Sequence, residues 1–335
     1  MITFSVIVPV FNRPAEVDEL LTSLAEQSFT DFEVILVEDG STIPCEHVAR
    51  RFEHRLNLQY LSKPNSGPSP SRNFGIDHAR GHYFVFFDSD CIVPPHYFRE
   101  LDQALALHDH DCHGGPDRAH PSFSPIQKAI SFAMTSFLTS GGIRGQSQHA
   151  LENFTPRGFN MGFARRVYET LGGFRGRFGE DIDLSTRIRK AHFSTRLIPQ
   201  AFVFHKRRLS WNAFFWQLFV FGITRVELAH LHPYSLKLVH LLPAAFTLAL
   251  PTALLTALFY SPSVLTPLLL YALVLTLDAL RQSRSLHVAR LAVLAAFIQL
   301  TAYGTGFLYA SFRTFILHRP IDLSIEFAKR YEKRK

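Results

Sequence analysis

The chain has 335 residues, of which 47% are hydrophobic, and its formal net charge of +7 comes from 35 Lys and Arg against 28 Asp and Glu. This length suits one large domain or two ordinary ones. The basic excess comes with no interleaved basic-aromatic platform and no nucleic-acid-binding motif, which argues against nucleic acid as a ligand. The three cysteines are an odd and sparse set, which fits reduced thiols better than a disulfide framework.

Strand and helix patterns alternate along the first ninety residues. In chain order they are strand 4–10, helix 14–27, strand 32–38, helix 44–53, strand 57–61, helix 69–79 and strand 83–88. Such alternation predicts an α/β fold, with a mostly parallel sheet and helices on both of its faces. Ligands of such sheets bind beyond the carboxyl ends of the strands.

Acidic residues follow two of these predicted strands. The second strand ends in VEDGS, which contains Asp39, and the fourth ends in FFDSDC, which contains Asp88 and Asp90. Two close carboxylates repel each other, and a divalent cation such as Mg²⁺ or Mn²⁺ offsets that repulsion. A polar turn also explains Asp-Ser-Asp taken alone. Because both acidic ends lie on one edge of the sheet, the pair favours a nucleotide and metal site.

Between these strands, residues 65–81 read NSGPSPSRNFGIDHARG. The Gly and Pro residues predict a loop, Ser69 or Ser71 can cap the helix that follows, and Arg72 and Asn73 fall in its first turn. A helix N-terminus that carries an arginine is well placed to meet a diphosphate or a nucleobase. An ordinary capped helix is the alternative.

Residues 236–315 differ in character from what precedes them. The stretches 238–260 and 291–312 contain no Asp, Glu, Lys or Arg, and each is long enough to cross a bilayer, which takes about 20 helical residues. The apolar stretch 264–277 between them is shorter and ends at Asp278. We therefore expect two to three transmembrane helices; the buried helical core of a soluble protein is the alternative.

Basic and aromatic residues flank these apolar stretches. The basic clusters are HKRR at 205–208, Arg281 with Arg284, and KRYEKRK at 329–335, a placement that suits an anionic cytoplasmic leaflet. If all three apolar stretches crossed the membrane after a cytoplasmic domain, however, the basic tail at 329–335 would lie on the opposite side of the membrane. Either one stretch does not cross, or the tail is an exception to this rule. WNAFFWQLFVFG at 211–222 predicts an interfacial helix, with a packed core helix as the alternative. No signal-peptide pattern precedes the first strand, so we expect the first part to face the cytoplasm.

The motifs SVIVPVFNR, VEDGS, GPSPSRNFGIDHARG and FFDSD, in this order, resemble those of the family-2 glycosyltransferases with the GT-A fold. RGFNMGFARRVYETLGGF at 157–174 and FGEDIDLSTRIRKAHF at 178–193 extend the resemblance to the acceptor side. It implies a GT-A nucleotide-sugar-binding catalytic domain, Rossmann-like with a mostly parallel sheet, followed by a helical membrane region. The expected domains are a catalytic domain at 1–205, an interfacial connector at 206–235, transmembrane helices at 236–315 and a basic tail at 316–335.

The resemblance also implies roles for particular residues in binding a nucleoside diphosphate sugar and activating an acceptor. The nucleotide part of the donor would be bound by Pro9, Asp39, Arg72 and Asp88. An Mn²⁺ or Mg²⁺ ion would be bound by Asp90, Asp88 and His205. The catalytic residues would be Asp181, as the general base for the acceptor hydroxyl, and Glu180 beside it. A packed or exposed histidine is the alternative for His205. Acids in a first helical turn can also serve only to complement the helix dipole.

The expected reaction is an inverting, cation-dependent transfer to a membrane-proximal or lipid-linked glycan, in cell-envelope or exopolysaccharide biosynthesis. The Gln-x-x-Arg-Trp motif of polymerising synthases is absent, because Gln217 and Arg225 are too far apart and no Trp follows, so we expect one sugar per encounter. A flexible segment at 139–148 is a candidate lid. A nucleotidyltransferase would be expected to carry a glycine-rich, lysine-bearing loop after the first strand, and none is present. A non-catalytic membrane scaffold is the remaining alternative, although all the expected acids are there.

Overall fold

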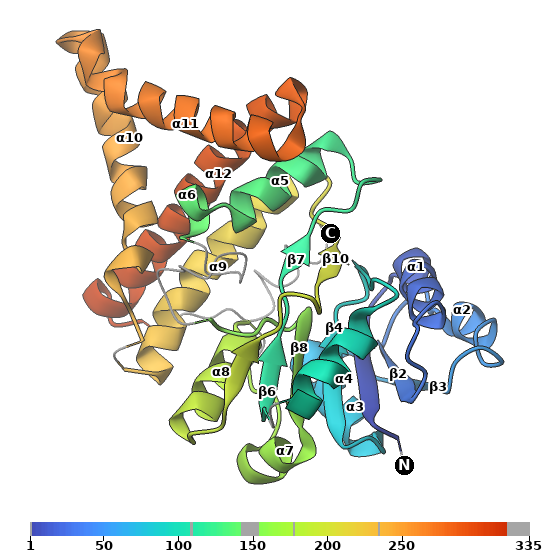
Figure 1. The fold of residues 1–335 in the computed structure, drawn as a ribbon. Coiled ribbons are helices and arrows are strands. Elements are labelled where there is room, and N and C mark those ends of the chain that lie inside the picture. The colour runs from blue at the N-terminus through green and yellow to red at the C-terminus, as the bar shows by residue number, and fades with distance from the viewer. Residues whose placement is uncertain (1, 108–109, 142–153, 177, 234, 320–335) are drawn as a thin grey trace. The chain divides into compact units, whose positions relative to one another are not determined.

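The computed structural model describes residues 2–107, 110–141, 154–176, 178–233 and 235–319 (Figure 1). Most of the candidate lid at 139–148 and most of the expected tail at 316–335 lie outside these residues. The chain forms two compact units. The first consists chiefly of Met1–His120 and Asn153–Lys206, and the second chiefly of Pro121–Ile143 and Arg207–Lys335.

A seven-stranded sheet lies at the centre of the first unit, counted over the described residues, with the order β3-β2-β1-β4-β8-β6-β9. Its strands are β1 Phe4–Val10, β2 Phe32–Asp39, β3 Leu58–Lys63, β4 Tyr83–Phe87, β6 Cys112–Gly114, β8 Asn160–Ala164 and β9 Thr195–Leu197. Strands β1 to β4 pair in parallel, and only β8 among these seven strands runs antiparallel to both of its neighbours. The mostly parallel sheet expected from the sequence is confirmed.

Helices pack on both faces of this sheet. One face is covered by α1 Pro14–Ala25, α2 Glu46–Arg50 and α4 Tyr97–Leu107, and the other by α3 Pro68–His78, α7 Arg165–Leu171 and α8 Glu180–Lys190. Alternate residues of each strand feed the two cores. In β4, for example, Val85 and Phe87 join the first core, whereas Phe84 and Phe86 join the second. This two-sided burial explains why the central strands read as continuous apolar runs.

A small second sheet lies beside the acidic loop after β4. Its strands, in the order β5-β10-β7, are β5 Cys91–Ile92, β7 Asp117–Arg118 and β10 Val203–His205. Strand β5 pairs antiparallel with β10, and this register places Cys91 opposite His205. The pairing therefore brings the loop that follows β4 close to the end of the first unit's chain.

A polar network crosses the buried centre of the first unit. The ring of His113, which is fully buried, lies between two hydroxyls: Nδ1 is 3.0 Å from the hydroxyl of Tyr83 and Nε2 is 3.2 Å from the hydroxyl of Tyr97. The Tyr97 hydroxyl donates to Asn160 Oδ1 at 2.7 Å, and Asn160 Nδ2 donates to the Ala201 carbonyl at 2.9 Å. Burial lowers the pKa of His113 to about 3, so the imidazole is neutral at ordinary pH.

The second unit is helical in its described part. Its elements are α5 Pro125–Thr135, α6 Phe137–Ser140, α9 Trp211–Leu231, η1 Leu238–His240, α10 Leu242–Phe259, η2 Pro262–Leu265, α11 Thr266–Ser283, α12 Leu286–Ser311 and η3 Phe312–Ile316. Glycines let α9 and α12 approach closely: a Cβ at Gly222 would lie 2.1 Å from the Tyr303 carbonyl oxygen, and one at Gly306 would lie 2.0 Å from that of Phe219. Such small-residue contacts are typical of membrane helix pairs.

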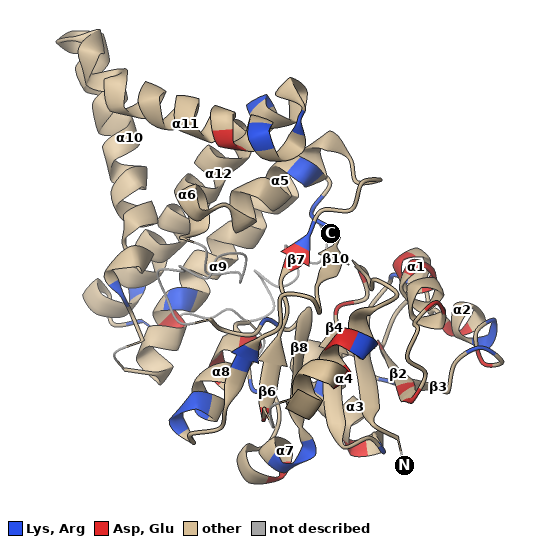
Figure 2. Cartoon of the chain, in the orientation of Figure 1, with Lys and Arg blue, Asp and Glu red and all other residues tan. Residues whose placement is uncertain are grey.

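Three stretches of the second unit are long and apolar enough to cross a membrane, within the residues described: Leu238–Phe259, Pro262–Ser283 and Leu286–Ile316. The middle stretch, which looks short from its uncharged run alone, reaches 22 residues. Figure 2 shows no charged residue along α10, and charges on α11 only towards one end. The helical C-terminal region expected from the sequence is present.

Helices α5 and α6 belong to this helical unit, although they fall within the range 1–205. Ala129, Ile130 and Ala133 of α5 share a core with residues of α11 and α12. The Ser136 hydroxyl donates to Asp278 Oδ2 of α11 at 3.1 Å. The insertion between β7 and β8 is thus folded together with the candidate membrane helices.

Candidate active site

Asp39, at the end of β2, anchors the loop that leads into α3. Its side chain is almost fully buried, and both of its oxygens are engaged: Oδ2 accepts from the Gly67 amide at 2.8 Å, and Oδ1 accepts from the Ser66 amide at 2.9 Å and from the Lys63 ammonium group. Gly67 has a φ of +94°, a conformation that a side chain would strain. Asp39 therefore shapes the start of α3. On the neighbouring strand, Pro9 lies opposite Val37 and is partly buried.

Arg72 joins two parts of the edge that are far apart in the sequence. Its guanidinium is 3% exposed and donates through Nη2 to Asp88 Oδ1 at 2.8 Å and through Nη1 to Glu180 Oε1 at 2.7 Å. It also lies over the ring of Phe174, with Cζ 5.2 Å from the ring centroid. Burial by itself lowers the pKa of Arg72, but Asp88 and Glu180 more than compensate and raise it. The arginine expected to meet the donor thus holds two carboxylates.

The first turn of α8 carries three acids with different surroundings. Asp181 accepts through Oδ2 from the Gly158 amide at 3.1 Å and through Oδ1 from the Ile182 amide at 2.8 Å. Burial raises the pKa of Glu180, and the charge of the neighbouring Asp181 adds to this effect. Asp183 pairs with Arg187, with Nε 2.9 Å from Oδ2. Asp183 is thereby tied to its own helix, whereas Asp181 is oriented by backbone amides.

Gly158 lies between Asp181 and the guanidinium of Arg72, and the sequence alone predicted no role for it. Its amide donates to Asp181, and a Cβ at this position would lie 3.0 Å from Arg72 Nη2. A second link comes from Asn73, which donates to the Phe174 carbonyl at 2.9 Å and accepts from the Phe174 amide at 2.8 Å. Both links fix the start of α3 against the segments near α8. The sequence signal for Gly158 was only a glycine next to Arg157 in the RGFN motif.

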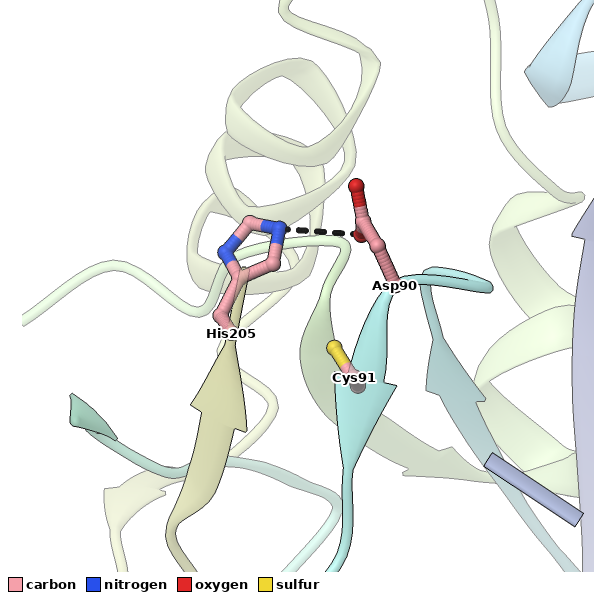
Figure 3. A group of neighbouring side chains, drawn as sticks. All are labelled: Asp90, Cys91 and His205. Carbon is pink, nitrogen blue, oxygen red and sulfur yellow. Dashed lines mark ion pairs between the residues drawn. The ribbon is translucent and has the colours of Figure 1, made fainter. Parts of the chain in front are cut away.

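Asp90 and His205 face each other across the pair of strands β5 and β10, with Cys91 on β5 beside them (Figure 3). His205 Nε2 is 3.2 Å from Asp90 Oδ1, and the His205 ring stacks on Phe159 at a centroid distance of 4.6 Å. The Cys91 thiol lies 3.6 Å from the Phe159 carbonyl oxygen, to which it donates. The potential ligand atoms of Asp90, Cys91 and His205 all lie within 4.8 Å of one another.

This group fits a divalent cation of the Mg²⁺ or Mn²⁺ type. A carboxylate oxygen and an imidazole nitrogen are suitable ligands, and cis ligands on an octahedral ion of this size are about 3 Å apart, close to the observed separation of the Asp90 and His205 atoms. Asp88 is not part of the group: its carboxylate pairs with Arg72 and is 37% exposed. The structure thus brings together two of the three expected ligands.

Arg13 forms an ion pair with Asp90 that the sequence did not reveal. The guanidinium contacts Asp90 Oδ2, on the opposite oxygen from His205. Burial lowers the pKa of Arg13, but the Asp90 carboxylate outweighs this effect and raises it. Asn12 holds the preceding turn at a φ of +55° and accepts hydrogen bonds from the amides of Thr42 and Ile43 at 2.8 and 2.9 Å. The FNR motif contained this arginine, but nothing in it pointed to residue 90.

Glycosyltransferases are found among proteins that are similar in sequence to this chain. Poly(ribitol-phosphate) beta-N-acetylglucosaminyltransferase TarS of Staphylococcus aureus strain Mu50 is 35% identical over 115 residues, which is 33% of this chain and 20% of TarS. The uncharacterized glycosyltransferase YibD of Escherichia coli K12 is 35% identical over 106 residues, 31% of this chain and 30% of YibD. The matches therefore span between a fifth and a third of the relatives' own lengths.

A solved structure shares the fold. Mannosyltransferase PcManGT from Pyrobaculum calidifontis, in complex with GDP-Man and Mn²⁺, superposes with a TM-score of 0.61 and 18% sequence identity, covering 88% of this chain and 86% of that one. The expected GT-A class is confirmed. The sequence model described as glycosyl transferase family 2 matches residues 5–172, ending before Asp181 and His205, whose roles stay predictions. Because that match covers half of the 335 residues, this chain belongs to glycosyl transferase family 2.

Proposed function

We propose that this protein transfers one sugar from a nucleoside diphosphate sugar to an acceptor hydroxyl group, with inversion at the anomeric carbon and with help from Mn²⁺ or Mg²⁺. The observation that carries the proposal is the bridge made by Arg72, whose buried guanidinium binds Asp88 on one side and Glu180 on the other. The acid expected on the donor side and the motif expected on the acceptor side are thereby held at one edge of the sheet.

In this reaction Asp181 accepts the proton of the acceptor hydroxyl as its oxygen attacks the anomeric carbon. The amides of Gly158 and Ile182 orient the carboxylate for that task. The bond to the diphosphate breaks as the new glycosidic bond forms, and a single displacement inverts the configuration. Asp90 and His205 would hold the divalent cation, which, when bound, stabilises the negative charge that develops on the departing diphosphate. Pro9, Asp39, Arg72 and Asp88 form the proposed donor side.

The proposed acceptor is a membrane-proximal or lipid-linked glycan of the cell envelope or of an exopolysaccharide. Three stretches in the described part of the second unit are long and apolar enough to cross a membrane, and basic clusters flank them. The name of the S. aureus relative describes transfer to poly(ribitol-phosphate), and the P. calidifontis protein was solved with GDP-Man. The first supports a polymeric acceptor here and the second a nucleotide-sugar donor, and we place the catalytic unit at the cytoplasmic face.

The direct test incubates membranes containing the full chain with a panel of nucleotide sugars, with Mn²⁺, with Mg²⁺ or with EDTA, and measures glycosylated product and released nucleoside diphosphate. We expect cation-dependent transfer with one of the donors. Asp181→Asn should lower the transfer rate about 10²–10⁴-fold, the usual contribution of a general base. Asp18→Asn is the matched control, because Asp18 pairs with Arg51 on the exposed surface of α1.

Four outcomes would contradict the proposal. Absence of transfer with every donor, or full activity of Asp181→Asn, would remove the proposed reaction or its base. Release of pyrophosphate from a nucleoside triphosphate would indicate a nucleotidyltransferase instead. Complementation in cells by Asp90→Asn and Asp181→Asn together would indicate a non-catalytic scaffold.

A further inference from the structure

We infer that Arg13 is an internal counter-cation for Asp90, which the divalent cation must displace, so that the cation binds tightly only together with the donor diphosphate. The inference rests on the proposed function and concerns the order and coupling of binding at that site. It starts from one contact, the ion pair between the Arg13 guanidinium and Asp90 Oδ2.

The ion pair between Arg13 and Asp90 is largely buried from solvent. The side chains of Arg13 and Asp90 are 17% and 11% exposed. An ion pair removed from water in this way is screened little by salt, and loss of one partner leaves the other charge without compensation. Arg13 therefore neutralises Asp90 when no cation is bound. A cation that uses Asp90 has to compete with a charge that is already there.

The backbone of Arg13 is fixed while its side chain can change partner. Asn12 ties the turn to the amides of Thr42 and Ile43, and the Arg13 carbonyl accepts from the Val17 amide at 3.0 Å in the first turn of α1. A switch from Asp90 to another anion thus needs only rotation about side-chain bonds. No rearrangement of α1 is required.

A diphosphate offers the guanidinium the partner that it needs. Arginine binds phosphate oxygens through two parallel hydrogen bonds, as it binds carboxylates. When the donor arrives, Arg13 can release Asp90 to the cation and bind a phosphate oxygen of the donor. The cation and the donor then favour each other's binding, which is a positive coupling free energy between two ligands.

The coupling can be measured by titrating the detergent-solubilised full chain with Mn²⁺ and recording free Mn²⁺ by electron paramagnetic resonance. Each titration is made without nucleotide, with UDP and with GDP, and the Mn²⁺ that the nucleotide binds in solution is subtracted. For the wild type we expect weak binding without nucleotide and binding about tenfold or more tighter with the matching nucleotide, within the usual range of such couplings.

Arg13→Gln should bind Mn²⁺ about tenfold more tightly than the wild type without nucleotide, and the nucleotide should increase that affinity less than it does in the wild type. Arg13→Lys, which keeps the charge, should retain weak nucleotide-free binding. Arg51→Gln is the matched control for the loss of a basic residue, since Arg51 is 59% exposed and pairs with Asp18. In an Asp90→Asn background, Arg13→Gln should no longer change Mn²⁺ affinity, because the carboxylate for which Arg13 and Mn²⁺ compete has been removed.

Unchanged or weaker nucleotide-free binding of Mn²⁺ by Arg13→Gln would overturn the inference. If that variant does not give a cooperative unfolding transition, Arg13→Met, which retains a long aliphatic side chain, takes its place with the same expected result. If the wild type transfers sugar but the Arg13 variants leave Mn²⁺ binding unchanged, the inference alone fails. If the wild type neither transfers sugar nor binds Mn²⁺, the inference and the proposed function both fail.

Discussion

Two arginines hold the acids of the candidate site, and they do so in different ways. Arg72, near the start of α3, is 3% exposed, binds Asp88 and Glu180, and lies over Phe174. Arg13, just before α1, is 17% exposed and binds Asp90. The first guanidinium is enclosed by two carboxylates and a ring, and the second shares one carboxylate with a histidine.

The difference separates a fixed part of the site from an exchangeable part. If Arg72 moved away, Glu180 would lose its partner in a buried place, which is costly. If Arg13 moved away, a divalent cation could replace it on Asp90. We therefore expect changes around Arg72 to act mainly on stability, and changes around Arg13 to act mainly on ligand binding.

The largest effect on stability should come from Arg72→Met. Removing one partner from a buried ion pair costs about 3–5 kcal/mol, and the partial exposure of Asp88 favours the lower end of this range. Urea unfolding of the solubilised chain, followed by circular dichroism, measures the change. Arg50→Met is the control: Arg50 pairs with Glu46 on the surface, so its loss should leave the urea midpoint almost unchanged. Equal effects of the two changes would show that Arg72 is no more important for stability than a surface arginine, and so is not a fixed part of the site.

An effect that is smaller for each unit of pH should come from acid, which acts away from both arginines at the buried His113. Its pKa of about 3 in the folded protein lies below the value of about 6.5 expected when unfolded. The unfolded chain therefore takes up a proton that the folded one does not. The stabilising contribution is complete above pH 6.5 and is lost as the pH falls towards 3, at about 1.4 kcal/mol per pH unit.

His113→Gln should have a shallower loss of stability than the wild type over this pH window, although the variant is less stable at pH 7. Urea midpoints measured at several pH values test this, with His82→Gln, on the surface of the first unit, as the control. Parallel pH profiles for the wild type and His113→Gln would contradict the assignment. The His82→Gln control shows how much of the change in the pH profile comes from losing any histidine, and how much comes from losing a buried one.

The smallest expected effects come from the two rings that support the two parts of the site. Phe174→Leu removes the ring beneath Arg72, and Phe159→Leu removes the ring stacked on His205. Each change should cost about 1 kcal/mol of stability. Only Phe159→Leu should also weaken Mn²⁺ binding, because it loosens the histidine. If Phe174→Leu weakened Mn²⁺ binding to the same extent, the two parts of the site would not be separable.

Much of the first unit could be predicted from local patterns in the sequence. Strands β1 to β4 begin and end within two residues of the expected positions, because apolar runs are bounded there by Gly, Pro, Asn and Asp. The second helix is shorter than its pattern, Glu46–Arg50 instead of 44–53, since turns follow it. The helix that begins at Trp211 runs on to Leu231, because no glycine or proline stops it after Gly222.

The parts that escaped prediction depend on contacts between distant residues. Strands β5, β7 and β10 have only two or three residues, too few for any periodicity, and β5 pairs with a strand more than a hundred residues further along the chain. The contact between Arg13 and Asp90 joins residues 77 positions apart, and it depends on a side-chain conformation. Local sequence patterns carry no information about either.

The insertion between β7 and β8 has a practical consequence for anyone who wishes to study the transferase unit in solution. A fragment that stopped at residue 206 would retain α5 and α6 but lose α11 and α12, against which they pack. Ile130, Phe132 and Met134 would then be left without the helices that help bury them, and such a fragment should aggregate. A fragment limited to the first unit has to omit α5 and α6 as well, or else the second unit has to be kept with them.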